Sequence, residues 1–251
     1  MKAKAYSAFS ELREDFRARV GAWQKAVPDL ASLQDELRQE LGNDDYRIEN
    51  PVVYNEALDD IREADEPAFV LVADNPGKNE QLSKNRRYLV GQSGKLAEGW
   101  FRRELGLDFR RDVIIINKTP VHTSRTAGLG KLLAIAERHG GGTRRDLEAL
   151  LGESQVEMAR IARRMHGALG VPLWISGYGE LGPRGLFRTY AEELAKSYAD
   201  APALREGVLL FRHFSMNQFA IEMKEKRDPG LPLRDELARI GKGNRQRILG
   251  W

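Results

Sequence analysis

Polar side chains that could do acid–base or hydrogen-bonding chemistry follow four separate apolar runs of this chain. They are Asp74 and Asn75 after the first run, Asn117 after the second, Ser176 after the third and His213 after the fourth. A carboxylate can act as a base or stabilise a cation, and an amide presents a hydrogen-bond donor and an acceptor. An imidazole can act as a base and can also donate or accept a hydrogen bond. The chain has no cysteine and only four histidines, so thiolate nucleophiles, disulfides and iron–sulfur or zinc–thiolate sites are excluded, and no metal site is expected.

The four apolar runs predict the buried strands that position these side chains. They cover residues 68–73, 113–116, 172–176 and 208–211, and segments with helical periodicity lie between them, at about 94–105, 131–139, 143–151, 153–169 and 188–199. Strands that alternate with helices predict a three-layer α/β/α fold around a central, mainly parallel four-stranded sheet. In such sheets ligands bind beyond the carboxyl ends of the strands, so we expect the polar residues to share one crevice.

The N-terminal quarter of the chain differs in composition from the rest. Apolar residues recur every three or four positions within residues 6–40, with an interruption at Pro28, which predicts two helices. Residues 1–66 contain 9 Lys and Arg against 16 Asp and Glu, whereas residues 67–251 contain 31 against 21. We therefore expect an acidic helical extension over residues 1–66, packed on a basic α/β domain over residues 67–251.

Composition and charge narrow the class of protein. With 251 residues, 41% of them hydrophobic and 31% charged, the chain can bury a sizeable core, which excludes a fibrous or wholly disordered protein. No apolar run approaches the ~20 residues of a membrane span. Charged residues follow the initial Met within a few positions, so we expect a cytoplasmic protein without a membrane partner. The basic excess after residue 66 favours a polyanion partner, with ordinary solvated helix faces as the alternative.

Two glycine motifs could bind nucleotides. Residues 177–182 (GYGELG) have the G-x-G-x-x-G pattern, but they follow the third strand rather than the first, and Pro183 interrupts the helix that should begin there. We interpret them as a turn that leads into a helix; an unrelated α/β enzyme that binds NAD or FAD here is a third hypothesis. Residues 91–95 (GQSGK) lack the first Gly and the Ser or Thr of a P-loop, which excludes triphosphate binding.

At these strand ends the sequence resembles the uracil-DNA glycosylase superfamily. Five segments carry the resemblance, in the family's order. Residues 72–77 (VADNPG) are similar to the motif G-x-N-P-G or G-E-A-P-G, and residues 86–94 (RRYLVGQSG) are similar to R-P-F-V-G-x-A-G. Residues 115–117 (IIN) resemble a strand ending in Asn, residues 174–177 (WISG) a strand whose end carries Gly, and residues 213–215 (HFS) the motif H-P-S. The resemblance covers about residues 68–219. It implies a DNA repair enzyme that flips a damaged base out of DNA and excises it without metal or cofactor.

The resemblance assigns catalytic roles to Asn75, Asp74 and His213. Hydrolysis of an N-glycosidic bond passes through a cationic, oxocarbenium-like sugar while the base leaves as an anion. Asn75 would position the attacking water, Asp74 would act as a base or stabilise the cation, and either can be the main catalytic group. His213 would donate a hydrogen bond to the oxyanion that develops on the base.

The resemblance also assigns residues that hold the base and the DNA. The base would lie against Asn117, Tyr88, Leu89, Pro76 and Gly77, and the amide of Asn117 would form paired hydrogen bonds with the pyrimidine edge. The DNA strand would contact Ser215, Met216, Asn217, Arg86 and Arg87, with Ser215 on a phosphate. Leu89 stands where the family stacks an aromatic ring on the base, so a DNA-binding relative without glycosylase activity is the alternative hypothesis.

Overall fold

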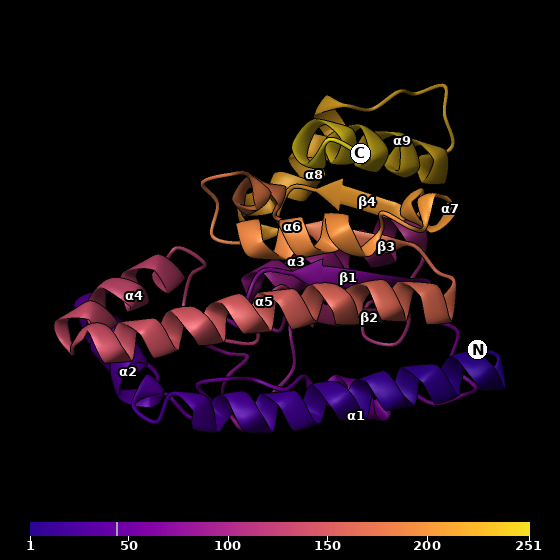
Figure 1. The fold of residues 1–251 in the computed structure, drawn as a ribbon. Coiled ribbons are helices and arrows are strands. Elements are labelled where there is room, and N and C mark those ends of the chain that lie inside the picture. Colours follow the sequence, from indigo (N-terminus) through magenta and orange to yellow (C-terminus); the bar gives the residue numbers. More distant parts are fainter. Residues whose placement is uncertain (44) are drawn as a thin grey trace.

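The centre of the molecule is a four-stranded parallel sheet. The structure, a computed structural model, describes residues 1–43 and 45–251. The strands are β1 (Phe69–Ala73), β2 (Val113–Asn117), β3 (Leu173–Ser176) and β4 (Val208–Phe211), in the spatial order β2-β1-β3-β4. All strand residues are buried, as their continuous apolar sequences require when both faces of a sheet are covered. The predicted three-layer fold is confirmed (Figure 1).

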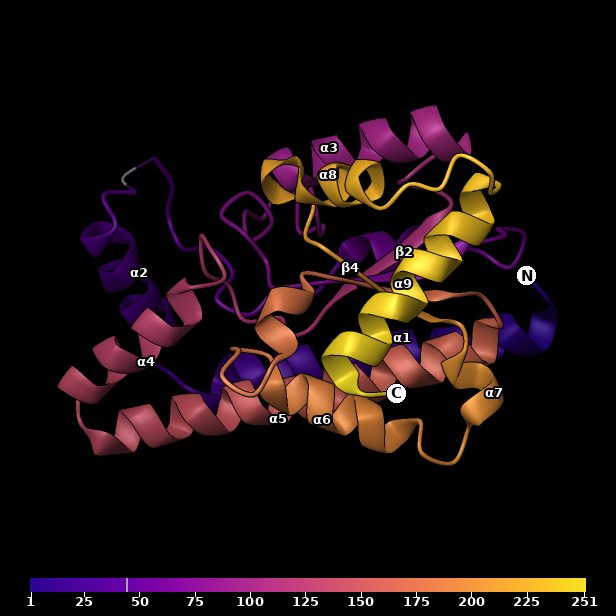
Figure 2. The ribbon, with the colours of Figure 1, turned by 90° about the horizontal axis from the view of Figure 1, so that it is seen from above.

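Helices cover both faces of this sheet (Figure 2). α3 (Gln92–Trp100) and α8 (Gln218–Glu225) lie on one face, α5 (Gly141–Leu169) and α6 (Arg188–Ser197) on the other, and α9 (Leu233–Leu249) packs along β4. The remaining helical elements of the described chain are α1 (Ala3–Ala26), α2 (Leu30–Glu40), α4 (Gly128–Arg138), α7 (Pro202–Arg205), 3₁₀ turns at Glu56–Asp60, Tyr178–Leu181 and Ser215–Asn217, and a π turn at Phe101–Leu105. None of these described helices has the length and apolar character needed to cross a membrane.

One continuous helix replaces two predicted ones. The helices expected over residues 143–151 and 153–169 form the single helix α5, with Gly152 near its middle. A glycine inside a helix costs about 1 kcal/mol relative to alanine. That penalty is small beside the packing of the two halves, which bury Leu150 on one side of the glycine and Met158 on the other. The glycine therefore does not end the helix.

Aromatic packing fixes which side of the sheet each strand residue faces. Phe69 of β1 stacks on Trp174 of β3 with ring centroids 4.4 Å apart, and Phe219 of α8 packs on Trp174 at 6.3 Å. These strand side chains therefore point to the α3/α8 face. Because side chains alternate along a strand, Ala73 faces the same side as Phe69. Asn117 faces that side too, since it pairs directly with Ala73.

The N-terminal helices pack on the sheet domain. α1 runs alongside α5 (Figure 1), and α2 packs on α4. The apolar stripe from Phe9 to Trp23 is buried, and the indole N–H of Trp23 donates to Glu153 of α5 at 3.0 Å. Gln34 of α2 donates to the carbonyl of His122, in the loop after β2, at 2.8 Å. The extension thus reaches the loops at the strand ends.

Candidate functional site

A pocket of about 780 Å³ opens at the carboxyl ends of the strands. The residues expected from the sequence that line it are Asp74, Asn75, Gly77, Leu89, His213, Ser215 and Met216. Pro76, Tyr88, Arg86, Arg87, Asn117 and Asn217 are not among its lining residues. The strand ends thus bring the three catalytic candidates, Asp74, Asn75 and His213, into one crevice, as the parallel topology predicts.

Both oxygens of the Asp74 carboxylate are held by hydrogen bonds. Nζ of Lys118 donates to Oδ1 at 2.5 Å, and the hydroxyl of Thr126 donates to Oδ2 at 3.0 Å. Lys118 is completely buried, and its Nζ also donates to the carbonyl of Ser176 at 2.6 Å. Sequence reasoning missed Lys118. Its position directly after Asn117, at the end of β2, could have identified it.

The loop of Asn75 is anchored by the segment after β2. The amide nitrogen of Asn75 donates to Oγ1 of Thr123 at 2.9 Å. The carbonyl of Pro76 accepts hydrogen bonds from the N–H of Thr123 at 3.2 Å and from Nδ1 of His122 at 2.9 Å. Burial lowers the pKa of His122 to about 4, so that ring is neutral. Because the amide nitrogen of Asn75 is used in this way, its oxygen can accept a hydrogen bond in the pocket.

His213 presents a neutral imidazole with a fixed tautomer. Its Nδ1 accepts the backbone N–H of Ser215 at 3.0 Å, and the hydroxyl of Ser215 lies 2.7 Å from the same atom. Burial lowers the pKa of His213; the charge of Asp74 opposes this effect, and that of Lys118 adds to it. The proton of the neutral ring is therefore on Nε2, which makes this atom a donor. The hydroxyl of Ser215, expected on a DNA phosphate, is bonded to His213 here.

Asn117 carries a buried amide with unused hydrogen-bonding capacity. The residue is 1% exposed, and neither Nδ2 nor Oδ1 has a hydrogen-bond partner in the described part of the chain. A buried polar group without a partner costs about 1–3 kcal/mol. Asn117 faces the same side of the sheet as Ala73, which lines the pocket. Because its amide is shielded and does not line the pocket, a ligand that supplies the missing donor and acceptor must first displace the side chains that cover it.

The two candidates for stacking on a base point to different places. Leu89 lines the pocket and has a left-handed backbone conformation, with φ at +54°. A Cβ atom on Gly94 of α3 would lie 1.4 Å from the carbonyl oxygen of Leu89, so only glycine permits this close approach. Tyr88 turns away from the pocket: it is buried, and its hydroxyl donates to the carbonyl of Val53 at 2.6 Å. Leu89, and not Tyr88, therefore has the position from which a side chain can cover a base.

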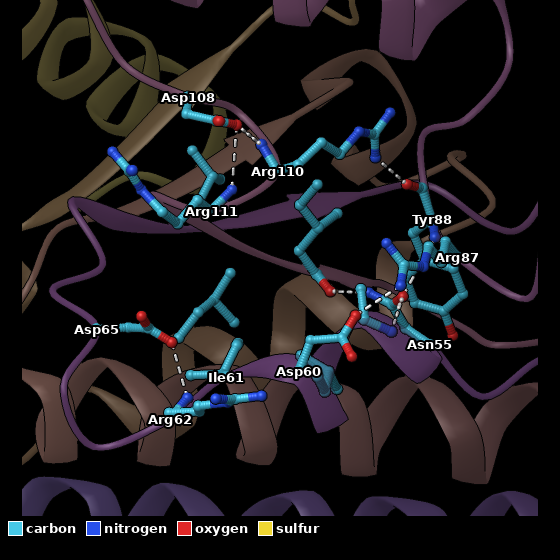
Figure 3. A pocket seen from close by; sticks show the side chains of 15 residues that line it. Asn55, Asp60, Ile61, Arg62, Asp65, Arg87, Tyr88, Asp108, Arg110 and Arg111 are labelled. Atoms are coloured by element: carbon cyan, nitrogen blue, oxygen red, sulfur yellow. Dashed lines mark hydrogen bonds and ion pairs between the residues drawn. The ribbon is translucent and has the colours of Figure 1, made fainter.

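Arg87 lines a second, smaller pocket, of about 510 Å³, beside β2 (Figure 3). Its Nη2 lies 2.5 Å from Oδ2 of Asp60, and the neighbouring Arg86 forms an ion pair with Glu56. Both carboxylates belong to the acidic extension. The two arginines expected on DNA are thus paired with carboxylates of the same chain.

Met216 and Asn217 form a strained corner after the fourth strand. Both have left-handed backbone conformations, with φ at +51° and +58°. Met216 lines the pocket and is 83% exposed, which is unusual for a large apolar side chain. Phe219, which follows this corner, is buried. The corner therefore holds one apolar side chain out from the rim of the pocket.

Glu80 is a titratable lining residue that sequence reasoning missed. The side chain is 8% exposed and lies in the pocket. Burial raises its pKa to about 7, although hydrogen bonds from the backbone of Gly77 and Leu89 oppose that shift. The only sequence feature that indicates Glu80 as a pocket residue is its position three residues after the Asn-Pro-Gly turn.

The G-x-G-x-x-G segment contributes to the same pocket. Gly177 has a φ of +77°, and a Cβ atom there would lie 2.5 Å from Oδ1 of Asp74. The segment forms a 3₁₀ turn at Tyr178–Leu181, and the next helix, α6, begins only at Arg188. The turn expected from the sequence is therefore present, and its first glycine makes room for the Asp74 carboxylate.

The fold and the pocket define an α/β protein with a polar pocket at the carboxyl edge of a parallel sheet. Comparison with known proteins finds no matching family model, no matching curated protein and no matching solved structure. A function for this site must therefore be argued from its own residues.

Proposed function

We propose that this protein is a DNA glycosylase that hydrolyses the N-glycosidic bond of uracil, or of a related deaminated base, in DNA. The observation that carries the proposal is the buried, unpartnered amide of Asn117 beside the pocket that holds Asn75, Asp74 and His213. A pyrimidine edge offers the donor and acceptor that this amide lacks. The order of donor and acceptor on that edge is what distinguishes uracil from cytosine.

The pocket supplies the groups that this hydrolysis needs. The nucleotide leaves the DNA stack and its base enters the pocket. As the bond between C1′ of the sugar and the base nitrogen breaks, its electron pair goes to the base, whose oxyanion accepts a hydrogen bond from Nε2 of His213. The carboxylate of Asp74 stabilises the cationic sugar. Asn75 Oδ1 orients a water that adds to C1′, and the proton which this water loses neutralises the departing base.

Side chains around the mouth suit a DNA strand. Arg125 is exposed and Arg212 is half-buried, and both line the pocket. Lys and Arg contacts with phosphates provide most of the affinity for DNA. Met216 is an exposed apolar side chain of the kind that fills the gap left by a flipped nucleotide. Arg212 is paired with Glu225, as Arg86 and Arg87 are with their own carboxylates, so Arg125 is the main phosphate contact in our proposal.

An inactive DNA-binding protein is the second candidate function. Leu89 offers no aromatic face to a base, and the Asp74 carboxylate is already bonded to Lys118 and Thr126. Both observations favour a pocket that admits a nucleotide without cleaving it. Retained DNA binding in the absence of base release would support this function.

The experiment that tests the proposal is base excision on labelled oligonucleotides. Each carries one uracil, hypoxanthine or xanthine, in a single strand and in a mismatched duplex, and alkali reveals abasic sites. We expect cleavage at one of these bases, and a loss of at least about a hundredfold in Asn75→Ala. Lys131→Ala, on the exposed side of α4, is the control and should excise the base normally. Absence of cleavage by the unmodified protein would overturn the proposal.

A further inference from the structure

Lys118 is the one lysine of the described chain that is completely excluded from solvent while it contacts a pocket carboxylate. Burying an ammonium group is strongly unfavourable unless its surroundings compensate the charge. Three electron-rich groups surround Nζ: Oδ1 of Asp74 at 2.5 Å, the carbonyl of Ser176 at 2.6 Å and the ring of Phe187, whose centroid is 5.0 Å away. These surroundings fit the charged form of lysine.

Burial and the neighbouring charges act on Lys118 in opposite directions. Burial lowers the pKa of Lys118, whereas the negative charges of Asp74 and Glu180 oppose this effect. His213, the titratable ring of the same pocket, is neutral and holds its proton on Nε2. Nζ donates to a carboxylate and to a carbonyl, and a charge-assisted hydrogen bond to a carboxylate is among the strongest available. The geometry is that of a buried ion pair.

We propose that Lys118 is a positioning residue of the pocket: it holds Asp74 as an oriented carboxylate beside the place where the cationic sugar forms. The part of this inference that concerns the cationic sugar rests on the proposed function. A carboxylate keeps one orientation when fixed donors hold its oxygens, and Nζ of Lys118 holds Oδ1 of Asp74 in this way. The ammonium does so from behind the carboxylate without occupying the pocket, because Lys118 itself does not line it.

The geometry explains why a lysine can act from this place. Asp74 and Lys118 follow β1 and β2, whose last residues, Ala73 and Asn117, are paired in register. The residue after each strand points to the face opposite its predecessor, so Lys118 meets Asp74 on the α5/α6 face while Asn117 stays on the α3/α8 face. The end of β2 thus places the amide of Asn117 on one face of the sheet and Lys118, the partner of the Asp74 carboxylate, on the other.

A double-mutant cycle tests this inference with Asp74→Asn, Lys118→Met and the double variant. We expect each single variant to lower the midpoint of thermal unfolding by roughly 10 °C, because it leaves one buried charge without its partner. The double variant should recover most of that loss, since no charge then remains. Midpoints that add would mean that Lys118 acts independently of Asp74, and would overturn the inference whether or not the protein is a glycosylase.

The same variants are then compared in base excision. Lys118→Met should lower the single-turnover rate by between about ten- and a hundredfold with DNA affinity unchanged, and should have no further effect in the Asp74→Asn background. Lys242→Met is the control: it breaks a 3.0 Å ion pair with Glu206 outside the pocket, and should leave the rate within about twofold. A rate loss of equal size in both Asp74 backgrounds would contradict the inference. Absence of excision by the unmodified protein would overturn the proposed function alone.

Discussion

The backbone N–H of Ser215 donates to Nδ1 of His213 at 3.0 Å, which places the proton of the neutral ring on Nε2. Since burial also lowers the pKa of His213, the ring stays a neutral donor at physiological pH. An oxyanion is stabilised best by a donor whose position and protonation are set before the charge develops. The turn after β4 meets both conditions with two residues that are two positions apart, His213 and Ser215.

This relationship predicts unequal effects of two substitutions. His213→Ala should slow base release by about 10²–10³-fold, the range for loss of one oxyanion donor. Ser215→Ala should cost only a few-fold, because the backbone N–H that fixes the tautomer remains. Single-turnover kinetics on a uracil oligonucleotide measure both. Equal losses would mean that the hydroxyl of Ser215 has a separate role, such as the phosphate contact expected from the sequence.

The positions of Tyr88 and Leu89 predict that one affects stability and the other affects activity. Tyr88→Phe removes a buried hydrogen bond to Val53 and should lower the free energy of unfolding by about 1 kcal/mol, with excision unchanged. Leu89→Ala should lower kcat/KM about tenfold, because it removes the side chain that covers the base. Denaturant unfolding and excision assays on both variants decide this. A Tyr88→Phe variant with normal stability and impaired excision would reverse the assignment.

Ion pairing within the chain predicts which arginines bind DNA. Arg125→Ala should weaken DNA binding and reduce the slope of log affinity against log salt by about 0.9, as expected for one lost phosphate contact. Arg87→Ala should leave the slope unchanged, because its guanidinium is paired with Asp60. Fluorescence anisotropy between about 50 and 200 mM salt measures both slopes. If the salt dependence of DNA binding were reduced in Arg87→Ala and not in Arg125→Ala, Arg87 would be the phosphate contact, as expected from the sequence.

Glu80 predicts a loss of stability as the pH rises. Its folded pKa of about 7 lies above the ordinary value of 4.5, so between these values the folded state keeps a proton that the unfolded state has lost. Stability therefore falls as the pH rises through this range, by up to about 3 kcal/mol. Glu80→Gln should be more stable than the unmodified protein at pH 8 and equally stable near pH 4.5. Glu192→Gln, at an exposed position, is the control and should keep the pH dependence of the unmodified protein. If the stability of Glu80→Gln also kept that pH dependence, the assignment of the raised pKa to Glu80 would be contradicted.

Most of the fold could be predicted from the sequence because its signals are local. The four strands are short, continuous apolar runs, and the residues that follow them must meet at one edge of a parallel sheet. The joining of two expected helices into α5 could not be predicted, because the packing of both halves outweighs the cost of Gly152.

The details of the site depend on tertiary contacts that no local pattern contains. The direction of Tyr88 is set by Val53 of the N-terminal extension, and the pairing of Arg87 by Asp60, both from a segment that the sequence indicated only as acidic and helical. The burial of Lys118 depends on three strand ends meeting. Residue types at strand ends could therefore be predicted, whereas their orientations could not.

The most direct test of the proposed function is the Asn117→Leu variant, measured for stability and base excision in the same preparation. We expect this variant, which removes an unpartnered buried amide at similar volume, to gain about 1–3 kcal/mol in the free energy of unfolding. We also expect excision to fall at least about a hundredfold, because the base edge loses its partner. A variant that is destabilised, or that excises the base at the normal rate, would contradict the claim that the Asn117 amide is kept for the substrate.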